Sequence, residues 1–110
     1  MIEFKRIVGK KICIDPEYVN FLGEDSDGDL YLIFEHGNTK LHPESNYEQL
    51  RSQLALVEFK DLGGEKFLLT PGDVKYLGEN EDGNLLLIHD YGKTILHSES
   101  NFNFLSEQVI

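Results

Sequence analysis

The sequence predicts a β-rich α+β fold. It is formed by tandem duplication of a unit of four or five short antiparallel strands followed by one C-terminal helix. The first observation is self-similarity: when the chain is aligned with itself after a shift of 55 residues, 24 of the 55 positions are identical, without a gap. The second is an Asp-Gly pair between two apolar runs, which occurs at Asp27-Gly28 and again at Asp82-Gly83. Asp-Gly in this setting is a strong signal for a β-hairpin.

The two copies, residues 1–55 and 56–110, are predicted to pack together. A unit of 55 residues buries too little apolar surface to be comfortably stable alone. The junction Leu54-Ala55-Leu56-Val57 is apolar and contains no Gly, Pro or Ser spacer, so it does not resemble a flexible linker. We therefore expect one globule with pseudo-two-fold symmetry. Whether the two sheets merge or pack face to face stays open.

The first part of each copy has strand periodicity. In Ile2–Ile7 apolar and polar residues alternate, as in a half-buried strand, and Lys11–Asp15 follows as a second strand. Pro16 then predicts a turn, since proline fixes φ. Val19 and Leu22 are three residues apart, which suits either one helical turn or the beginning of the next strand.

The second part of each copy predicts a hairpin, a further strand and the helix. Asp27-Gly28 predicts a two-residue type I′ turn leading into Leu30–Phe34, which is apolar on both sides and should be covered on both faces. After Thr39–His42, Ser45 begins a capping-box pattern and predicts a helix start. Apolar residues then recur at helical spacing in both copies: Tyr47, Leu50 and Leu54 in the first, and Phe102, Leu105 and Val109 in the second.

The charge balance is strongly acidic. The net charge is −10, divided into −4 for residues 1–55 and −6 for residues 56–110. Both halves should repel phosphate backbones, so we expect no direct nucleic-acid binding. The single Cys13 excludes an internal disulfide and suits a reducing compartment, and no segment predicts a signal peptide or membrane insertion. These features predict a cytoplasmic protein.

The acidic hairpin tips are the most conspicuous polar feature. The run 25–29 resembles a calcium loop, because hard cations prefer clustered carboxylates. Its glycine falls one step after the second aspartate and no glutamate follows at the required distance, so the helical calcium-loop pattern is not met. A solvated hairpin tip is the favoured interpretation, and no metal or cofactor is expected.

Other reactive side chains predict no catalysis. His42 and His97 are equivalent between the copies, but two imidazoles alone make a poor zinc site. Cys13 corresponds to Leu68, which favours a packed, inert thiol. Ser45 and its equivalent are explained by helix capping. We therefore assign no catalytic residue and expect no enzymatic activity.

The order of these residues resembles the small FlbD/SwrD-type bacterial flagellar motility proteins. The resemblance covers each copy and runs through Ile2–Ile7, Gly9-Lys10, Asp15-Pro16, Tyr18-Val19, Gly37 and Glu44-Ser45. It implies a non-catalytic cytoplasmic accessory that acts through protein contacts. In strand order and closing helix the chain is also similar to the DNA-binding LytTR-type domain, although the acidic balance argues against that role.

Two functional hypotheses follow, and a third, a small-ligand binder, has little support. The first is a non-catalytic protein-interaction module, an adaptor or regulator whose partner is another protein; homodimer formation stays open. The alternative is an acidic nucleic-acid mimic, such as a phage anti-restriction or anti-CRISPR inhibitor of a DNA- or RNA-binding enzyme. The mimic hypothesis depends on the acidic residues of the two hairpin tips, whereas the interaction module could dock through an apolar surface. The candidate protein-interaction residues are these acidic residues: Glu24, Asp25, Asp27, Asp29, Glu79, Glu81 and Asp82.

Overall fold

The structure is a computed structural model that describes residues 1–109 and confirms the predicted β-rich α+β fold. The elements of the first copy are β1 (Ile2–Lys5), β2 (Lys11–Ile14), the 3-10 turn η1 (Pro16–Tyr18), β3 (Val19–Glu24), β4 (Leu30–Phe34), β5 (Gly37–Lys40) and α1 (Tyr47–Ser52). The same order continues with β6 (Val57–Lys60), β7 (Lys66–Leu69), η2 (Pro71–Asp73), β8 (Val74–Glu79), β9 (Leu85–His89), β10 (Gly92–Ile95) and α2 (Phe102–Val109). Each copy thus has five strands and one α-helix.

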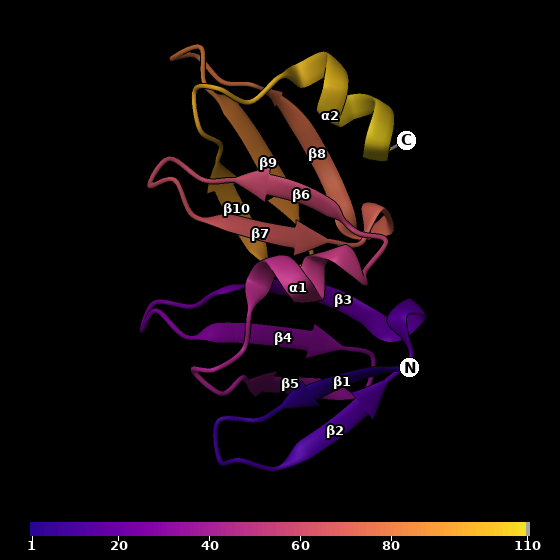
Figure 1. Cartoon of the computed structure of the whole chain (residues 1–110). Helices are drawn as coiled ribbons and strands as arrows, with labels where there is room; N and C mark the ends of the chain where they lie inside the picture. The colour runs from indigo at the N-terminus through magenta and orange to yellow at the C-terminus, as the bar shows by residue number, and fades with distance from the viewer. Residues whose placement is uncertain (110) are drawn as a thin grey trace.

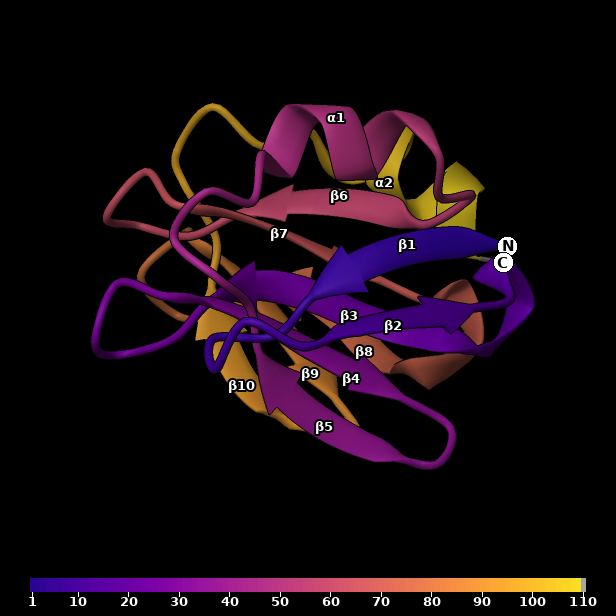
Figure 2. The same ribbon diagram turned by 60° about the horizontal axis from the view of Figure 1, so that its bottom comes forward.

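The strands form three antiparallel sheets along a molecule of 45 × 27 × 21 Å. β1 and β2 form a two-stranded sheet, β5-β4-β3-β7-β6 a five-stranded sheet, and β10-β9-β8 a three-stranded sheet. In Figure 1 the β1–β2 pair lies at one end of the molecule, and β8 and α2 lie at the other. Both helices lie on the same side of the sheets, at the top of Figure 2. The copies merge in the middle sheet, where β3 pairs with β7.

Two hydrophobic cores stabilise the globule, and each core includes or contacts an apolar side chain from the other copy. Leu68 of β7 belongs to the first core, together with Leu22 of β3 and Leu50 of α1. Phe21 of β3 packs in turn against the second core and stacks on Phe67, with 5.9 Å between the ring centroids. Because the cores interlock, the two copies form one packed body.

The joint between the copies differs from the expected pseudo-two-fold arrangement. A two-fold axis would make β8 pair with β2 in the same way that β3 pairs with β7. Within residues 1–109, β2 pairs only with β1 and β8 only with β9. The joint is head to tail, so it uses different surfaces of the two copies.

Two local predictions are also corrected. The hairpin tip is not a type I′ turn, because Gly28 alone adopts a positive φ, of 83°. Asp25 and Asp29 close a three-residue loop in which Gly28 N–H donates to the Asp25 carbonyl, a longer hairpin turn that ends in a left-handed glycine. The helix cap is Asn46 rather than Ser45, since Asn46 Oδ1 accepts from the Gln49 N–H at 3.0 Å.

A glycine pair tests how tightly the copies are joined. A Cβ on Gly23 would lie 2.6 Å from Cβ of Phe67 on β7, whereas a Cβ on the equivalent Gly78 would meet only the movable ring of Tyr76. We expect Gly23→Ala to destabilise the fold by about 1–3 kcal/mol, the usual range for overpacking. Gly78→Ala, the matched control, should cost clearly less. Urea unfolding of both variants measures the difference, and equal losses would contradict the close approach of β7.

Candidate functional site

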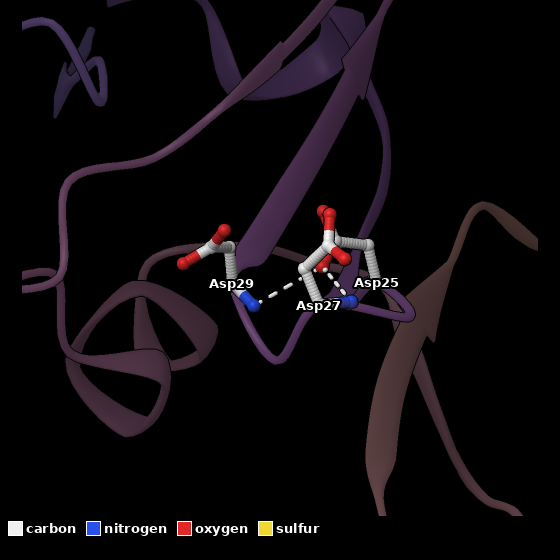
Figure 3. Close-up of side chains that lie close together, drawn as sticks. All are labelled: Asp25, Asp27 and Asp29. Atoms are coloured by element: carbon white, nitrogen blue, oxygen red, sulfur yellow. Dashed lines mark hydrogen bonds between the residues drawn. The ribbon is translucent and has the colours of Figure 1, made fainter.

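The acidic residues singled out in the sequence lie at two separate hairpin tips. Asp25, Asp27 and Asp29 lie at the β3–β4 turn, and Figure 3 shows their carboxylates close together. The side chain of Asp25 organises the turn, because its Oδ1 accepts from the N–H of Asp27 at 2.9 Å and of Asp29 at 3.1 Å. Glu24 ends β3 beside this tip. The residues Glu79, Glu81 and Asp82 lie at the β8–β9 end of the molecule and are exposed.

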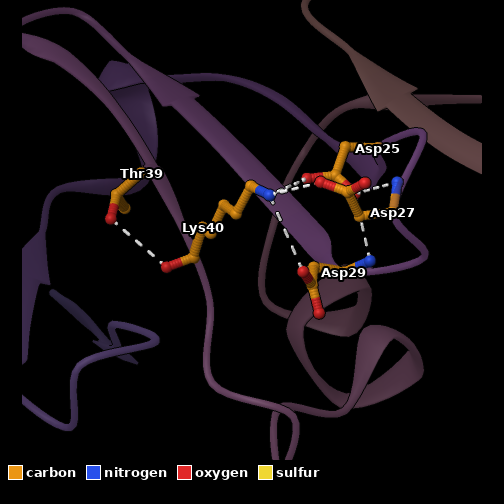
Figure 4. A network of polar contacts seen from close by, with 5 residues as sticks. All are labelled: Asp25, Asp27, Asp29, Thr39 and Lys40. Carbon is orange, nitrogen blue, oxygen red and sulfur yellow. Dashed lines mark hydrogen bonds and ion pairs between the residues drawn. The ribbon is translucent and has the colours of Figure 1, made fainter.

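The first acidic tip carries its own counter-ion. Lys40 of β5 reaches it, with Nζ at 2.7 Å from an oxygen of Asp27, 3.4 Å from Asp25 and 3.8 Å from Asp29 (Figure 4). The bond to Asp27 raises the pKa of Lys40. Partial burial raises the pKa of Asp25, but the two backbone N–H groups and Lys40 outweigh that effect and hold it below its ordinary value. The tip is therefore a partly neutralised network.

The second copy shows that the turn itself needs no charge. Asn80 replaces Asp25 and accepts the same two backbone hydrogen bonds, at 3.0 and 3.1 Å. Asn84 replaces Asp29, and Ile95 replaces Lys40. The second copy therefore lacks both the lysine and two of the carboxylates that the lysine neutralises in the first copy. The three carboxylates of the first tip are close enough to hold a metal ion, but the Lys40 ammonium already supplies the positive charge there.

Removal of the Lys40 side chain should lower the stability of the fold measurably. Lys40→Ile leaves three adjacent carboxylates facing one another, so we expect a lower melting temperature at neutral pH and low salt. The folded state lowers the pKa of Asp25. The loss of stability in Lys40→Ile should therefore be fully present at pH values above the ordinary aspartate pKa, and it should disappear as the pH falls through the lowered pKa of Asp25. The triple variant Asp25→Asn/Asp29→Asn/Lys40→Ile, which copies the second tip, should recover stability. A melting temperature of Lys40→Ile that equals wild type at all pH values would contradict the network.

The histidines have local structural roles. Nδ1 of His42 accepts from the Glu44 N–H, and Nδ1 of His97 accepts from the Glu99 N–H, each at 3.1 Å. The only group of possible metal ligands within residues 1–109 is the aspartate triad, so the two histidines do not come together as ligands. Cys13 is exposed, which corrects the prediction of a packed thiol; its counterpart Leu68 is 1% exposed.

A groove of about 340 Å³ runs along the joint between the copies. Aromatic side chains of both copies line it, among them Phe21, Phe67 and Tyr91. Glu24 and Glu65 face each other at its edge, and repulsion from Glu24 is the main cause that raises the pKa of Glu65. The joint therefore places two like charges next to each other.

Sequence reasoning missed a concentrated basic segment. The turn end of the β1–β2 hairpin, residues 5–11, carries Lys5, Arg6, Lys10 and Lys11 and no acidic residue, although Glu3 lies farther along β1. The rest of the chain carries six cations and 20 acidic residues, a net charge of −14. A charge count in a short sliding window would have found this segment, which the totals over residues 1–55 concealed. In the second copy the equivalents of Arg6 and Lys10 are acidic.

The cations of this hairpin are accessible. Arg6 Nε donates to Thr39 Oγ1 at 3.2 Å but forms no ion pair in the described part of the chain, and neither does Lys10. Lys5 and Lys11 form only long contacts to exposed carboxylates, at 3.5 Å to Glu44 and 3.7 Å to Glu3. Such exposed pairs contribute little and exchange readily with other anions. We define the basic ribbon as residues 5–11, a cationic tip on a two-stranded sheet.

Comparison with known proteins supplies a fold relative. No protein-family model and no curated protein matches the sequence. A solved structure, the LytTr DNA-binding domain of a response regulator from Bacillus cereus, superposes with a TM-score of 0.60 at 16% identity. The alignment covers 98% of this chain and 94% of that chain. At this identity the likeness shows a shared fold.

This likeness corrects the functional predictions. A protein-interaction module, a nucleic-acid-mimic inhibitor and the exclusion of nucleic acid as a partner do not agree with a fold relative that is a DNA-binding domain. These predictions relied on the total charge, which concealed the basic ribbon. The resemblance to the FlbD/SwrD-type proteins stays a prediction. No helix within residues 1–109 is long and apolar enough to cross a membrane.

Proposed function

We propose that this chain is a non-catalytic, cytoplasmic DNA-binding domain whose basic ribbon contacts the duplex. The observation that carries the proposal is the concentration of four cations, without any acidic residue, in residues 5–11 of an otherwise acidic chain. The fold shared with the LytTr DNA-binding domain supports it. In Figure 1 the β3–β4 turn, which carries the first acidic tip, projects to the same side as the β1–β2 turn, so it limits how the domain can approach DNA.

Local charge outweighs total charge at this scale. At physiological salt the Debye length is about 8 Å, so charges farther away than that are largely screened. The molecule is 45 Å long, and the basic ribbon lies at one end of it (Figure 1). A phosphate at the tip therefore experiences Arg6 and Lys10, and the nearby Glu3 and Glu44, more strongly than the acidic residues at the far end of the molecule. The acidic remainder lowers the affinity and discourages side-on binding.

The shape of the ribbon suits a DNA groove. The major groove admits a two-stranded β-ribbon, and β1 and β2 form one, which a bridge between Arg6 and Leu41 joins to the segment after β5. Between the cations, Ile7 and Val8 are exposed at the turn, Val8 to 70%. Apolar side chains at such a tip can contact the methyl group of thymine, while the flanking cations bind phosphates. The basic ribbon thus presents two exposed apolar side chains, Ile7 and Val8, between its cations.

Salt dependence tests the proposal directly. Four phosphate contacts give a slope of about −3.6 in a plot of log K against log salt, or roughly a 100-fold loss of affinity between 50 and 200 mM salt. The measurement is fluorescence anisotropy of a labelled 25-base-pair duplex of mixed sequence, titrated with the full chain. Saturable binding that weakens in this way supports the proposal. No binding at 50 mM salt to any of a pool of random duplexes would refute it.

A further inference from the structure

We propose that copies of this chain associate head to tail, with β8 of one molecule pairing with β2 of the next. The inference goes beyond DNA binding and does not depend on it. It follows from the joint inside the chain, which serves as a template for a second joint between chains. The edges that would form the second joint lie at opposite ends of the molecule (Figure 1).

The internal joint is an antiparallel pairing of β3 with β7. Leu22 lies opposite Leu68, flanked by the pairs Phe21 with Leu69 and Gly23 with Phe67. In the repeat, β8 is the equivalent of β3, and β2 is the equivalent of β7. Among residues 1–109 each of these two strands has a strand partner on one side only, so each presents an unpaired edge, and α2 packs close to β8.

The free edges leave part of the apolar surface of a joint uncovered, although Ile14 on β2 is itself buried in the first core. Leu22 is 0% exposed, while the equivalent Leu77 is only partly buried. Tyr76, the equivalent of the stacked Phe21, is 49% exposed. Cys13 occupies the place of the buried Leu68 and is exposed. Transfer of the internal register places Leu77 opposite Cys13 and Tyr76 opposite Ile14.

Gly78 completes this match. At the internal joint, the close approach of Phe67 requires Gly23, because a Cβ there would lie 2.6 Å from Phe67 Cβ. Gly78 does not adopt a positive φ, and within its own chain a Cβ there would meet the ring of Tyr76, whose Oη would lie at 2.6 Å. In the transferred register Gly78 lies opposite Ile12. Because it has no side chain, Gly78 would allow the same close approach of a second strand that Gly23 allows at the internal joint.

Charge complementarity favours a second copy of this chain as the partner of the free strand edges. Inside the chain Glu24 faces Glu65, a repulsive pair. The equivalents across two chains are Glu79 and Lys10, an attractive pair. More broadly, the basic ribbon of one chain would meet the exposed acidic tip of the other, which contains Glu79, Glu81 and Asp82.

The second joint should be weaker than the first. At the internal joint, Tyr47 and Arg51 of α1 bind Glu58, with Arg51 Nε at 2.8 Å from its carboxylate. Their equivalents in α2 are Phe102 and Ser106, which cannot repeat these bonds. Reversible association is therefore expected. Because it is heterologous, it leads to open chains of several copies rather than closed dimers.

Substitutions of Cys13 test the joint without disturbing the monomer, since this side chain is exposed. Cys13→Leu copies Leu68 and should strengthen association roughly fourfold to fifteenfold, because leucine buries one to two methylene equivalents more than cysteine, at about 0.8 kcal/mol each. Cys13→Lys places a charge opposite Leu77 and should abolish association. Sedimentation velocity over a wide concentration range, with reductant and without DNA, measures both variants against wild type. Monomers throughout, or equal association of the two variants, would overturn the proposal.

A charge exchange adds an independent test of the pairing. Lys10→Glu and Glu79→Lys should each weaken association about two- to fivefold, and the double variant should restore it. DNA binding should follow a different pattern, because Lys10→Glu weakens it whether or not residue 79 is changed. No restoration in the double variant would count against the head-to-tail register. Failure of association would leave DNA binding to be judged by its own salt titration.

Discussion

Reversal of the two unpaired cations of the basic ribbon, Arg6→Glu/Lys10→Glu, is expected to reduce DNA affinity by at least tenfold at 100 mM salt. Each lost phosphate contact lowers the magnitude of the salt slope by about 1. The slope should therefore become shallower, changing from about −3.6 to about −2. Neither side chain forms an ion pair within the described residues, so the fold should tolerate the change. Anisotropy titrations at several salt concentrations measure both quantities.

The matched control is Lys60→Glu/Lys93→Glu. These lysines also form no ion pair within residues 1–109, and the net charge changes by the same amount. If binding depends on the ribbon, this control should lose only a small part of the affinity. Equal losses in both double variants would mean that total charge, and not the ribbon, governs binding.

A gain of function sharpens the same test. In the second copy, Asp61 and Glu65 stand where the first has Arg6 and Lys10. Asp61→Arg/Glu65→Lys should create a second basic tip and raise DNA affinity. It removes the repulsion between Glu24 and Glu65, but it also removes the hydrogen bond that Asp61 Oδ1 accepts from the N–H of residue 65, so the two effects on stability oppose each other. Unchanged affinity would show that four cations on a hairpin are not sufficient.

The largest effect on stability is expected for Leu22→Ala. Leu22 is completely buried in the first core, and replacement of a buried leucine by alanine costs about 2–5 kcal/mol. The equivalent Leu77→Ala should cost about half as much or less, because Leu77 is only partly buried on the free edge of β8. Urea unfolding at low protein concentration, where association is absent, measures both. Equal losses would contradict the open edge of β8.

Much of the fold could be predicted locally. The repeat of Asp-Gly between apolar runs predicted both hairpins, and alternation in Ile2–Ile7 predicted β1. Errors arose where neighbouring patterns overlap. Ser45 and Asn46 are both good caps, and only the backbone geometry showed that Asn46 accepts the bond. Val19 and Leu22 suited a helical turn or a strand, and the structure has a 3-10 turn followed by β3.

The candidate site was harder to predict, because tertiary contacts decide which charged side chains are neutralised by a partner and which stay accessible. The sequence showed the acidic tip but not that Lys40, 11 residues after Asp29, would neutralise it. The basic ribbon was visible as a local run of charge, yet its separation as a two-stranded sheet at one end of the molecule depends on how the strands pair.

By itself, the sequence determined the duplication, the antiparallel hairpins with their closing helix, and the acidic composition. These features depend on local periodicity and turn chemistry, which each segment carries within itself. The tertiary structure alone decided that β3 pairs with β7 while β2 and β8 stay free. Edge strands of two copies with nearly the same pattern offer the same hydrogen-bonding groups, so only the packing of whole cores selects which edges meet.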